Sequence, residues 1–559
     1  MPSAPSPASR FSWAAPLCAL AGVAVYLNAL GNPFVYDDRT TIVNNPSIRH
    51  LGNLGGIFRF DPKRPVVNFS YALNYAWSGL SPLGYQLTNV LLHALNIVLL
   101  FHLVERALED SEARRAGSGR APSQAALAAA LLCAVHPLLS EAIGYTSARS
   151  GVLCASFSLA ALLCMRRGLV DRRPRWVAAA LAAMVFGMAC KETAALLPFA
   201  FVAYDWLLLP SDPDARRRRL LRLHLPLVAL IAVAGGARLV LFARLELSGI
   251  RPFSDHLLTQ LPIFWRYFAL FVAPLSLSLA HSVRVIHDPF DGVVVISVAA
   301  LLVILAAAWR IRRRAPAVTF GVVWYLLFMA PSSIIPLAEH MSEHRTYEAS
   351  FGLFIIAGVG WSALRARYHR GAQLAGVAAL LAMAALTLAR NRVWSAPISL
   401  WQDAVAKAPD LWTAHYALAN EYQYDGQFQN AITQYGAAIR LQPSQRAIVN
   451  VGTCLAQLGR LDEAARMYQM ALQVGPGPDP YFNLGLLEVA RHHPAEARDD
   501  FLQVIALDAN NLLARKALVD LYDSELHDPP AALRLCREIA AIDPTTDGVA
   551  ECLRAHAAP

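Results

Sequence analysis

The sequence is poor in charge. Only 16% of its 559 residues are Asp, Glu, Lys or Arg, 56% are hydrophobic, and the mean hydropathy is +0.38. This balance is too apolar for an ordinary soluble domain. The composition therefore predicts a protein that is mostly embedded in a membrane.

Lysine is also scarce, since Lys63, Lys191, Lys407 and Lys516 are the only lysines. The excess of Arg and Ala indicates a GC-rich bacterial genome, so we expect the bacterial inner membrane. The net charge of +9 is basic enough for nucleic acid. However, the arginines form short clusters between apolar runs, where the positive-inside rule places them, and we expect no nucleic-acid partner.

Cysteine motifs are missing. None of the eight cysteines has C-x-x-C spacing, and five of them lie in or at the ends of apolar runs, where a thiol packs as a small hydrophobe: Cys18, Cys133, Cys154, Cys164 and Cys190. We expect neither a zinc site nor a disulfide framework. The run 12–30 lacks a clear cleavage site, which predicts an uncleaved first span.

Eleven apolar runs are long enough to cross a bilayer, which takes about 17 to 25 helical residues. They lie near 12–30, 87–105, 123–141, 149–165, 175–190, 192–209, 223–243, 291–309, 317–336, 349–364 and 371–389. Arginine clusters fill alternate loops, which we place in the cytoplasm. The expected class is all-α, with a polytopic membrane domain over 1–390.

The apolar stretch 261–280 is the exception in this topology. It contains Pro262, Arg266 and Pro274, and a charge at the bilayer centre costs about 2.5 to 3.5 kcal/mol on insertion scales. We therefore expect an interfacial or re-entrant segment. The N-terminus is then inside and the C-terminal domain outside, in the periplasm.

A repeat with a period near 34 residues occupies 391–559. Small and aromatic residues recur in register: Gly426, Ala431, Tyr435, Ala438, Pro443; Gly459, Ala464, Tyr468, Ala471, Pro476; Ala497, Phe501, Ala509; Ala532, Cys536, Ile539, Pro544; and, in a preceding half-unit, Trp401, Ala404, Pro409. This pattern is typical of tetratricopeptide repeats, about four and a half of them. Such a solenoid offers a concave groove for an extended polypeptide or a partner protein.

Polar residues gather in five segments that the topology places on the outer face: 31–86, 136–150, 190–193, 244–290 and 339–350. Ionisable residues at a membrane boundary are candidates for function because they are costly to keep there. Asp37 and Asp38 follow the first span, and Asn89, His93 and Asn96 form a polar stripe on the second. His136, Glu141, Lys191, Glu192, Glu339, Glu343, His344 and Arg345 complete the set.

At each of these candidate positions, a purely structural explanation competes with a functional one. A solvated loop explains the aspartate pair, helix packing explains His93, and mutual neutralisation explains Lys191 with Glu192. The His and Glu residues of 339–345 match no zinc motif. Arg345 with His344 suggests a phosphate clamp, because Arg suits bidentate phosphate contact.

Taken in order, these motifs resemble the transmembrane and tetratricopeptide repeat-containing family. The resemblance rests on the DD pair, the run from Arg64 to Asn96, HP with the later E and R, the KE hairpin, the EHRTY loop and the repeat tail. Members of that family are GT-C glycosyltransferases, and the eukaryotic ones are O-mannosyltransferases. The resemblance implies transfer of a sugar from a polyprenyl-phosphate carrier to a protein or glycan acceptor, usually with inversion.

The resemblance also implies roles. Asp38 is expected to be the base or acceptor orienter and Asp37 its partner, while Arg345, His344 and Lys191 face the donor phosphate. Glu141, Glu192, His93, Arg64 and His136 are expected to contact the acceptor or support the site. A divalent metal is left open, with Asp37 and Asp38 as its ligands if one binds.

Two other classes compete with a transferase. A polytopic scaffold whose repeats recruit partners for envelope assembly is the main alternative. A transporter is weaker, because the sequence has no inverted repeat and no matching pair of broken spans.

Overall fold

The computed structural model describes residues 13–115, 122–245, 252–337 and 339–556, and every element in these ranges is a helix. This confirms the expected all-α class. The chain divides into two compact units, Met1–Leu400 and Trp401–Pro559. The boundary lies close to the expected one at 390/391.

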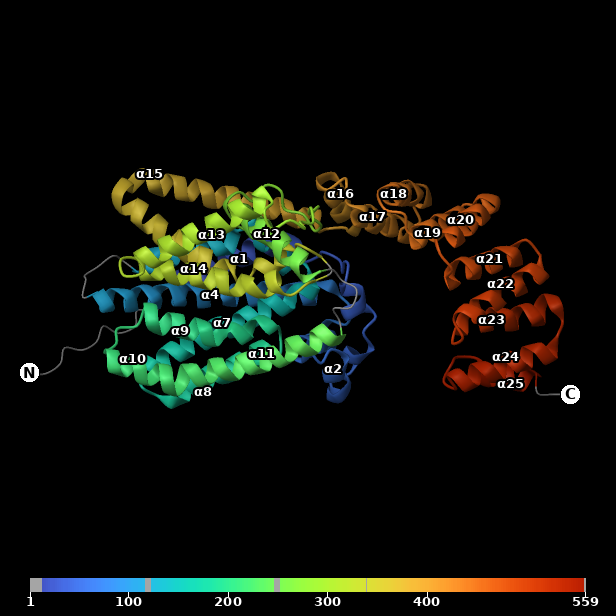
Figure 1. The fold of residues 1–559 in the computed structure, drawn as a ribbon, viewed down its shortest axis with the longest axis horizontal. Helices are drawn as coiled ribbons and strands as arrows, with labels where there is room; N and C mark the ends of the chain where they lie inside the picture. The colour runs from blue at the N-terminus through green and yellow to red at the C-terminus, as the bar shows by residue number, and fades with distance from the viewer. Residues whose placement is uncertain (1–12, 116–121, 246–251, 338, 557–559) are drawn as a thin grey trace, which may run out of the picture. The chain divides into compact units, whose positions relative to one another are not determined.

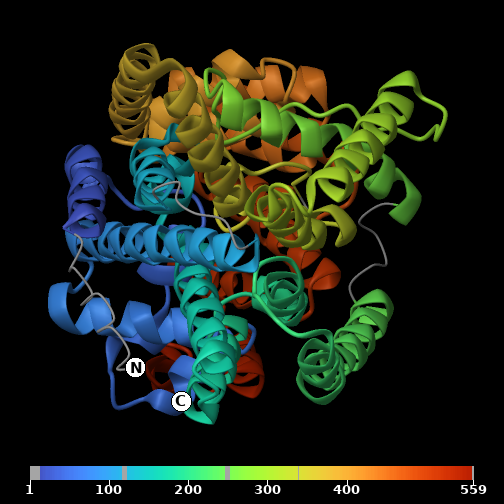
Figure 2. The same cartoon turned by 90° about the vertical axis from the view of Figure 1, so that its left-hand side faces the viewer.

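The first unit is a bundle of helices that lie side by side (Figures 1 and 2). Its longer elements are α1 (Ala14–Tyr26), α2 (Leu54–Phe60), α3 (Pro65–Ser78), α4 (Pro82–Arg115), α5 (Pro122–Val135), α6 (Ser140–Gly144), α7 (Arg149–Val170), α8 (Pro174–Met188), α9 (Leu197–Leu207), α10 (Pro213–Arg219), α11 (Leu225–Leu245), α12 (Phe253–Val272), α13 (Gly292–Ile311), α14 (Pro316–Ile334) and α15 (Ser350–Val393). Short 3-10 or π turns connect several of them: η1 (Leu27–Ala29), η2 (Arg39–Val43), η3 (Pro46–Arg49), η4 (Pro137–Leu139), η5 (Thr146–Ala148), η6 (Glu192–Leu196), η7 (Leu220–His224) and η8 (Glu343–Thr346).

Helices occupy all eleven expected spans. Among the described residues, six helices are long and apolar enough to cross a membrane, and a seventh follows if the bent pair Ser123–Val135 and Pro137–Gly144 is one span. The 44-residue α15 bends sharply at His369 (φ 37°) and turns back on itself (Figure 1), so it covers two expected spans. The remaining spans are the shorter helices α1, α8 and α9. The multi-pass membrane class is thereby supported, while the count of eleven stays a prediction.

The segment expected to lie at the interface forms most of α12. Pro262 lies inside this helix, and Arg266 donates hydrogen bonds to the Ser282 carbonyl (3.0 Å) and to His281 Nδ1 (3.2 Å). These contacts tie α12 to the extended chain that follows it. α12 is not one of the six helices that are long and apolar enough to cross a membrane. Its interfacial placement stays a prediction.

The polar stripe of α4 faces protein. Asn89 donates to the Ile143 carbonyl (3.0 Å), and Asn96 donates to the Val152 carbonyl (2.9 Å). Asn89 also accepts a hydrogen bond from buried Arg149 (2.7 Å), whose guanidinium reaches the Tyr85 carbonyl (2.9 Å). Because a buried polar group must be paired, these bonds fix the segment 140–149 against α4.

The second unit consists of paired helices: α16 (Pro397–Lys407), α17 (Trp412–Tyr424), α18 (Phe428–Leu441), α19 (Gln445–Gln457), α20 (Leu461–Val474), α21 (Pro478–Ala490), α22 (Pro494–Leu507), α23 (Leu512–Leu521), the π turn η9 (Tyr522–Leu526), α24 (Pro529–Ile542) and α25 (Val549–His556). α16 begins just before the unit boundary. Gly426 and Gly459 hold φ of +75° in the turns inside the first two repeats, and His492 holds +61° at the matching place in the third. The expected repeats are confirmed by this register.

The prediction about cysteine is wrong at one point. Cys536 and Cys552 form a disulfide, with Cα atoms 5.9 Å apart. The two residues are 16 positions apart, and only the packing of α25 on α24 brings them together. No local spacing in the sequence could reveal the pair.

Close packing between repeat helices predicts opposite effects for two glycines. A Cβ at Gly452 would lie 2.5 Å from the Tyr468 ring, whereas a Cβ at Gly436 would meet nothing closer than 3.7 Å. Gly452→Ala should therefore lower the unfolding free energy by about 1 to 3 kcal/mol. Gly436→Ala should raise it by up to about 1 kcal/mol through helix propensity. Thermal unfolding of the purified chain measures both, and equal effects would contradict the packing.

Candidate functional site

A cavity of about 390 Å³ lies among the loops of the first unit. All five polar segments expected on the outer face contribute to its lining, 244–290 through Leu279. Seven of the ten expected site residues line it: Asp37, Arg64, Glu141, Lys191, Glu192, His344 and Arg345. Asp38, His93 and His136 do not. The fold thus joins charged groups that are up to about 300 residues apart in sequence.

Asp37 presents its carboxylate to this cavity. The preceding residue, Tyr36, adopts a left-handed backbone conformation (φ 51°), which is uncommon for a residue other than Gly and clusters at functional sites. The Tyr145 hydroxyl donates a hydrogen bond to Asp37. Burial raises the pKa of Asp37, and the Tyr145 hydrogen bond and the charges of His344 and Arg64 oppose this rise.

Asp38 points the other way, into the protein, and is fully buried. Its Oδ1 accepts hydrogen bonds from the backbone N–H (2.7 Å) and hydroxyl (2.6 Å) of Ser147, and its Oδ2 accepts one from Val35 N–H (3.2 Å). Burial raises the pKa of Asp38 to about 6 against these hydrogen bonds. Asp38 therefore fastens the first outer loop to η5 and does not face the cavity.

Two cations face the cavity on another side. Arg64 precedes α3, and Lys191 lies at the tip between α8 and α9. Among the described residues, no carboxylate lies within salt-bridge distance of either group. Burial lowers the pKa of Lys191, and the nearby charge of Arg64 lowers it further, while Glu192 and Glu348 oppose the change. Two close cations in this arrangement attract an anion.

Arg345 is more constrained. Its guanidinium donates to the Glu339 carbonyl (3.0 Å) and lies 3.8 Å from the Glu339 carboxylate. Glu339 also accepts hydrogen bonds from the Tyr36 hydroxyl (3.0 Å) and from Ser342 (2.5 Å). This network holds the loop before α15 over the first outer loop and uses part of the hydrogen-bonding capacity of Arg345.

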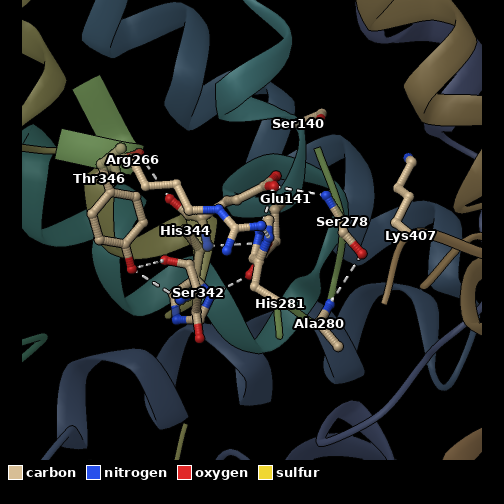
Figure 3. A network of polar contacts seen from close by, with 12 residues as sticks. Ser140, Glu141, Arg266, Ser278, Ala280, His281, Ser342, His344, Thr346 and Lys407 are labelled. Carbon is tan, nitrogen blue, oxygen red and sulfur yellow. Dashed lines mark hydrogen bonds and ion pairs between the residues drawn. The ribbon is translucent and has the colours of Figure 1, made fainter. Parts of the chain in front are cut away.

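Glu141 and His344 form the best-defined ion pair of the lining. His344 Nδ1 lies 2.5 Å from Glu141 Oε1, and the other oxygen accepts the backbone N–H of Glu343 (3.3 Å). Figure 3 draws Glu141 and His344 in one network of polar contacts with His281 and Ser278. His281 and Ser278 both donate to the buried Glu343 carboxylate (2.9 and 2.7 Å). Glu343, with His281 and Ser278, thus forms a second buried polar network, which is linked to the Glu141–His344 pair through the backbone N–H of Glu343.

His93 and His136 have structural partners. His93 is buried, with Nδ1 2.8 Å from the Tyr347 hydroxyl, and His136 stacks on Phe271 while Nε2 lies 2.9 Å from the Phe271 carbonyl. The helix-packing explanation suits His93, and His136 joins α12 to η4. Their expected roles at the acceptor have no geometric support.

Tyr145 and Ser147 are site residues that the sequence does not predict. Tyr145 orients Asp37, and Ser147 anchors Asp38. Both residues are uncharged, and the charged residue that marks their segment in the sequence is Glu141. Only the folded loop shows that each aspartate has its own hydroxyl partner.

The donor set at the aspartates does not suit a metal. Both carboxylate oxygens of Asp38 accept hydrogen bonds from N–H or O–H groups, which leaves Asp37 as a single carboxylate. In the described part of the chain, the only group of three or more His, Cys, Asp or Glu ligands close enough for an ion lies at the C-terminus.

Comparisons with known proteins agree with both units. Residues 62–237 match the family model of dolichyl-phosphate-mannose-protein mannosyltransferases, and 416–479 match that of tetratricopeptide repeats. Two tetratricopeptide structures, one of them from Thermus thermophilus, match at 18% identity over 28% and 32% of this chain and 81% and 95% of theirs. Their TM-scores are 0.24 and 0.26.

Curated relatives extend over most of the chain. Protein O-mannosyl-transferases of Caenorhabditis elegans, Drosophila melanogaster (Tmtc3) and Homo sapiens (TMTC1) are 24%, 24% and 25% identical over 75%, 82% and 79% of this chain. The chain spans 61%, 58% and 56% of their lengths. The chain is thus similar over most of its length to protein O-mannosyl-transferases, and it combines a stretch that matches the mannosyltransferase model with a stretch that matches tetratricopeptide repeats.

Proposed function

We propose that the chain is an inverting GT-C glycosyltransferase. It takes a sugar, with mannose as the first candidate, from a polyprenyl-phosphate carrier and transfers it to a hydroxyl of a polypeptide or glycan on the extracytoplasmic face. The observation that supports this most is one cavity with a partly buried carboxylate, Asp37, and two cations, Arg64 and Lys191, that form no short ion pair with the described residues.

Asp37 is the general base in this proposal. It accepts the proton of the acceptor hydroxyl as that oxygen bonds to the anomeric carbon, while the bond from that carbon to the phosphate oxygen breaks on the opposite face. The electron pair leaves with the phosphate, and Arg64 and Lys191 stabilise the charge that develops there. Tyr145 holds the carboxylate in place. Asp38 acts indirectly, by fixing the loop.

The other lining residues suit a lipid-linked donor. Phe328, Pro331 and Ile335 at the end of α14 contribute apolar surface to the lining, and Glu141 with His344 contributes polar surface. A cavity that combines apolar surface with two cations fits a phosphate that carries both a polyprenyl tail and a sugar. The repeat tail then offers its groove to the acceptor polypeptide or to a partner protein.

The experiment that tests this function is glycan profiling of cells that carry wild-type or Asp37→Asn protein. A transferase loses its product in the variant while the protein stays folded in the membrane. A scaffold for envelope assembly, the main alternative, keeps both its partners and the cell's glycans. Unchanged glycans with wild-type levels of the variant would reject the proposal.

The activity should fall as the pH is lowered through the pKa of Asp37, because only the ionised carboxylate can accept a proton. Since burial raises this pKa above the ordinary value of 3.8, the acid limb of the rate profile should lie above that value. Tyr145→Phe removes a hydrogen bond that lowers the pKa, so the limb should move to higher pH. A limb that Tyr145→Phe leaves in place would count against Asp37 as the base.

A further inference from the structure

Helices α24 and α25 of the repeat unit together carry a cluster of side chains that can bind a metal ion. Cys536 in α24 and Cys552 in α25 are joined by the disulfide, and their Cα separation of 5.9 Å is typical of such pairs. Cys536 is buried, whereas Cys552 and His556 are partly accessible. The cluster lies outside the cavity and plays no part in the proposed transfer.

His556 completes a metal-ligand set. It follows Cys552 by four residues, so the two side chains lie on the same face of α25. Ligand atoms of Cys536, Cys552 and His556 all lie within 4.8 Å of one another. Two thiolates and an imidazole are the ligands that Zn²⁺ prefers, and three protein ligands leave a fourth position for water.

The carboxylate of Asp523 contacts the imidazole of His556. His556 Nε2 lies 3.1 Å from Asp523 Oδ2. Zinc-binding histidines commonly bond one ring nitrogen to a carboxylate while the other binds the metal. Asp523 lies in the π turn η9 (Tyr522–Leu526), which is followed by His527 with φ of +50°, and such turns are frequent at functional sites.

We propose that Cys536, Cys552 and His556 form a redox-gated zinc site that fastens α25 to α24. When a thiol reductant supplies two electrons and two protons, the S–S bond breaks and two thiols form. Zn²⁺ then binds both sulfurs and releases the two thiol protons. A disulfide oxidant reverses the change, since it takes the two electrons, restores the S–S bond and frees the ion. α25 is therefore linked to α24 both by the disulfide in the oxidised protein and by Zn²⁺ in the reduced protein.

Cobalt binding to the full-length protein in detergent tests this proposal. After reduction with a phosphine and removal of the reductant, Co²⁺ should bind at one ion per chain with thiolate-to-cobalt absorption, and Zn²⁺ should displace it. The oxidised protein should show no such band. Asp523→Asn should weaken Co²⁺ binding about tenfold or more, because the histidine loses its partner.

Two cysteine variants separate this site from other thiols. Cys552→Ser should abolish the band, whereas Cys454→Ser, which changes another buried cysteine of the repeat unit, should leave it unchanged. A reduced wild-type chain without the band, or a band that survives Cys552→Ser, would overturn the proposal. Neither result depends on the transferase activity.

Discussion

Asp37→Asn should lower kcat about 10²- to 10⁴-fold, the usual contribution of a general base. The amide has nearly the shape of the carboxylate and can still accept the Tyr145 hydrogen bond, but it cannot take the acceptor's proton. Since Asp37 faces the cavity and supports no buried side-chain contact beyond this one among the described residues, stability should change little. Initial rates with a lipid-linked sugar and the melting temperature of the same preparation measure both quantities.

Asp38→Asn is the matched control, because it makes the same change at the neighbouring residue. In this variant the side-chain amide nitrogen would face an N–H donor, that of Val35 or Ser147, so one buried hydrogen bond is lost and stability should fall by about 1 to 3 kcal/mol. Any loss of rate in Asp38→Asn should come from unfolding of the loop that Asp38 fixes, not from loss of the base. The assignment of the base would be contradicted if Asp37→Asn kept most of its rate while folded Asp38→Asn lost it.

Lys191→Met and Arg64→Gln should each lower the rate of transfer about 10²- to 10³-fold, the usual effect of removing one group that stabilises a developing charge. Each substitution keeps much of the side-chain length and removes the positive charge. Polyprenyl phosphate without a sugar should also stabilise each variant less than wild type against heating, because a ligand that binds more weakly stabilises the folded state less. Rate assays and thermal shifts with this lipid check the two effects.

Lys63→Met is the control for this pair. Lys63 precedes Arg64 directly but does not line the cavity, so removing its charge changes the net charge of the protein equally and should leave the rate close to wild type. Equal losses in Lys63→Met and Lys191→Met would indicate a general electrostatic effect and contradict a phosphate site at Lys191.

The sequence predicted the composition of the cavity better than the roles within it. Ionisable residues at span ends are conspicuous, and the topology placed five polar segments on one face, so Asp37, Glu141, Lys191 and His344 could be found without a structure. Which of two adjacent aspartates faces the cavity depends on the left-handed turn at Tyr36. No pattern of residue types reveals that turn.

The sequence also could not predict contacts between segments that are far apart in the chain. Arg345 suggested a phosphate ligand by its type, but its engagement with Glu339 makes Arg64 and Lys191 the stronger candidates. The disulfide between α24 and α25 depends on the packing of two helices at the end of the solenoid.

The most direct test of the central claim is a structure of the full-length protein with a polyprenyl-phosphate-linked sugar bound. The account predicts the phosphate in contact with Arg64 and Lys191 and the sugar's anomeric carbon on the side of Asp37, with room for an acceptor hydroxyl between them. A phosphate bound away from both cations, or a sugar that Asp37 could not reach through an acceptor hydroxyl, would contradict it.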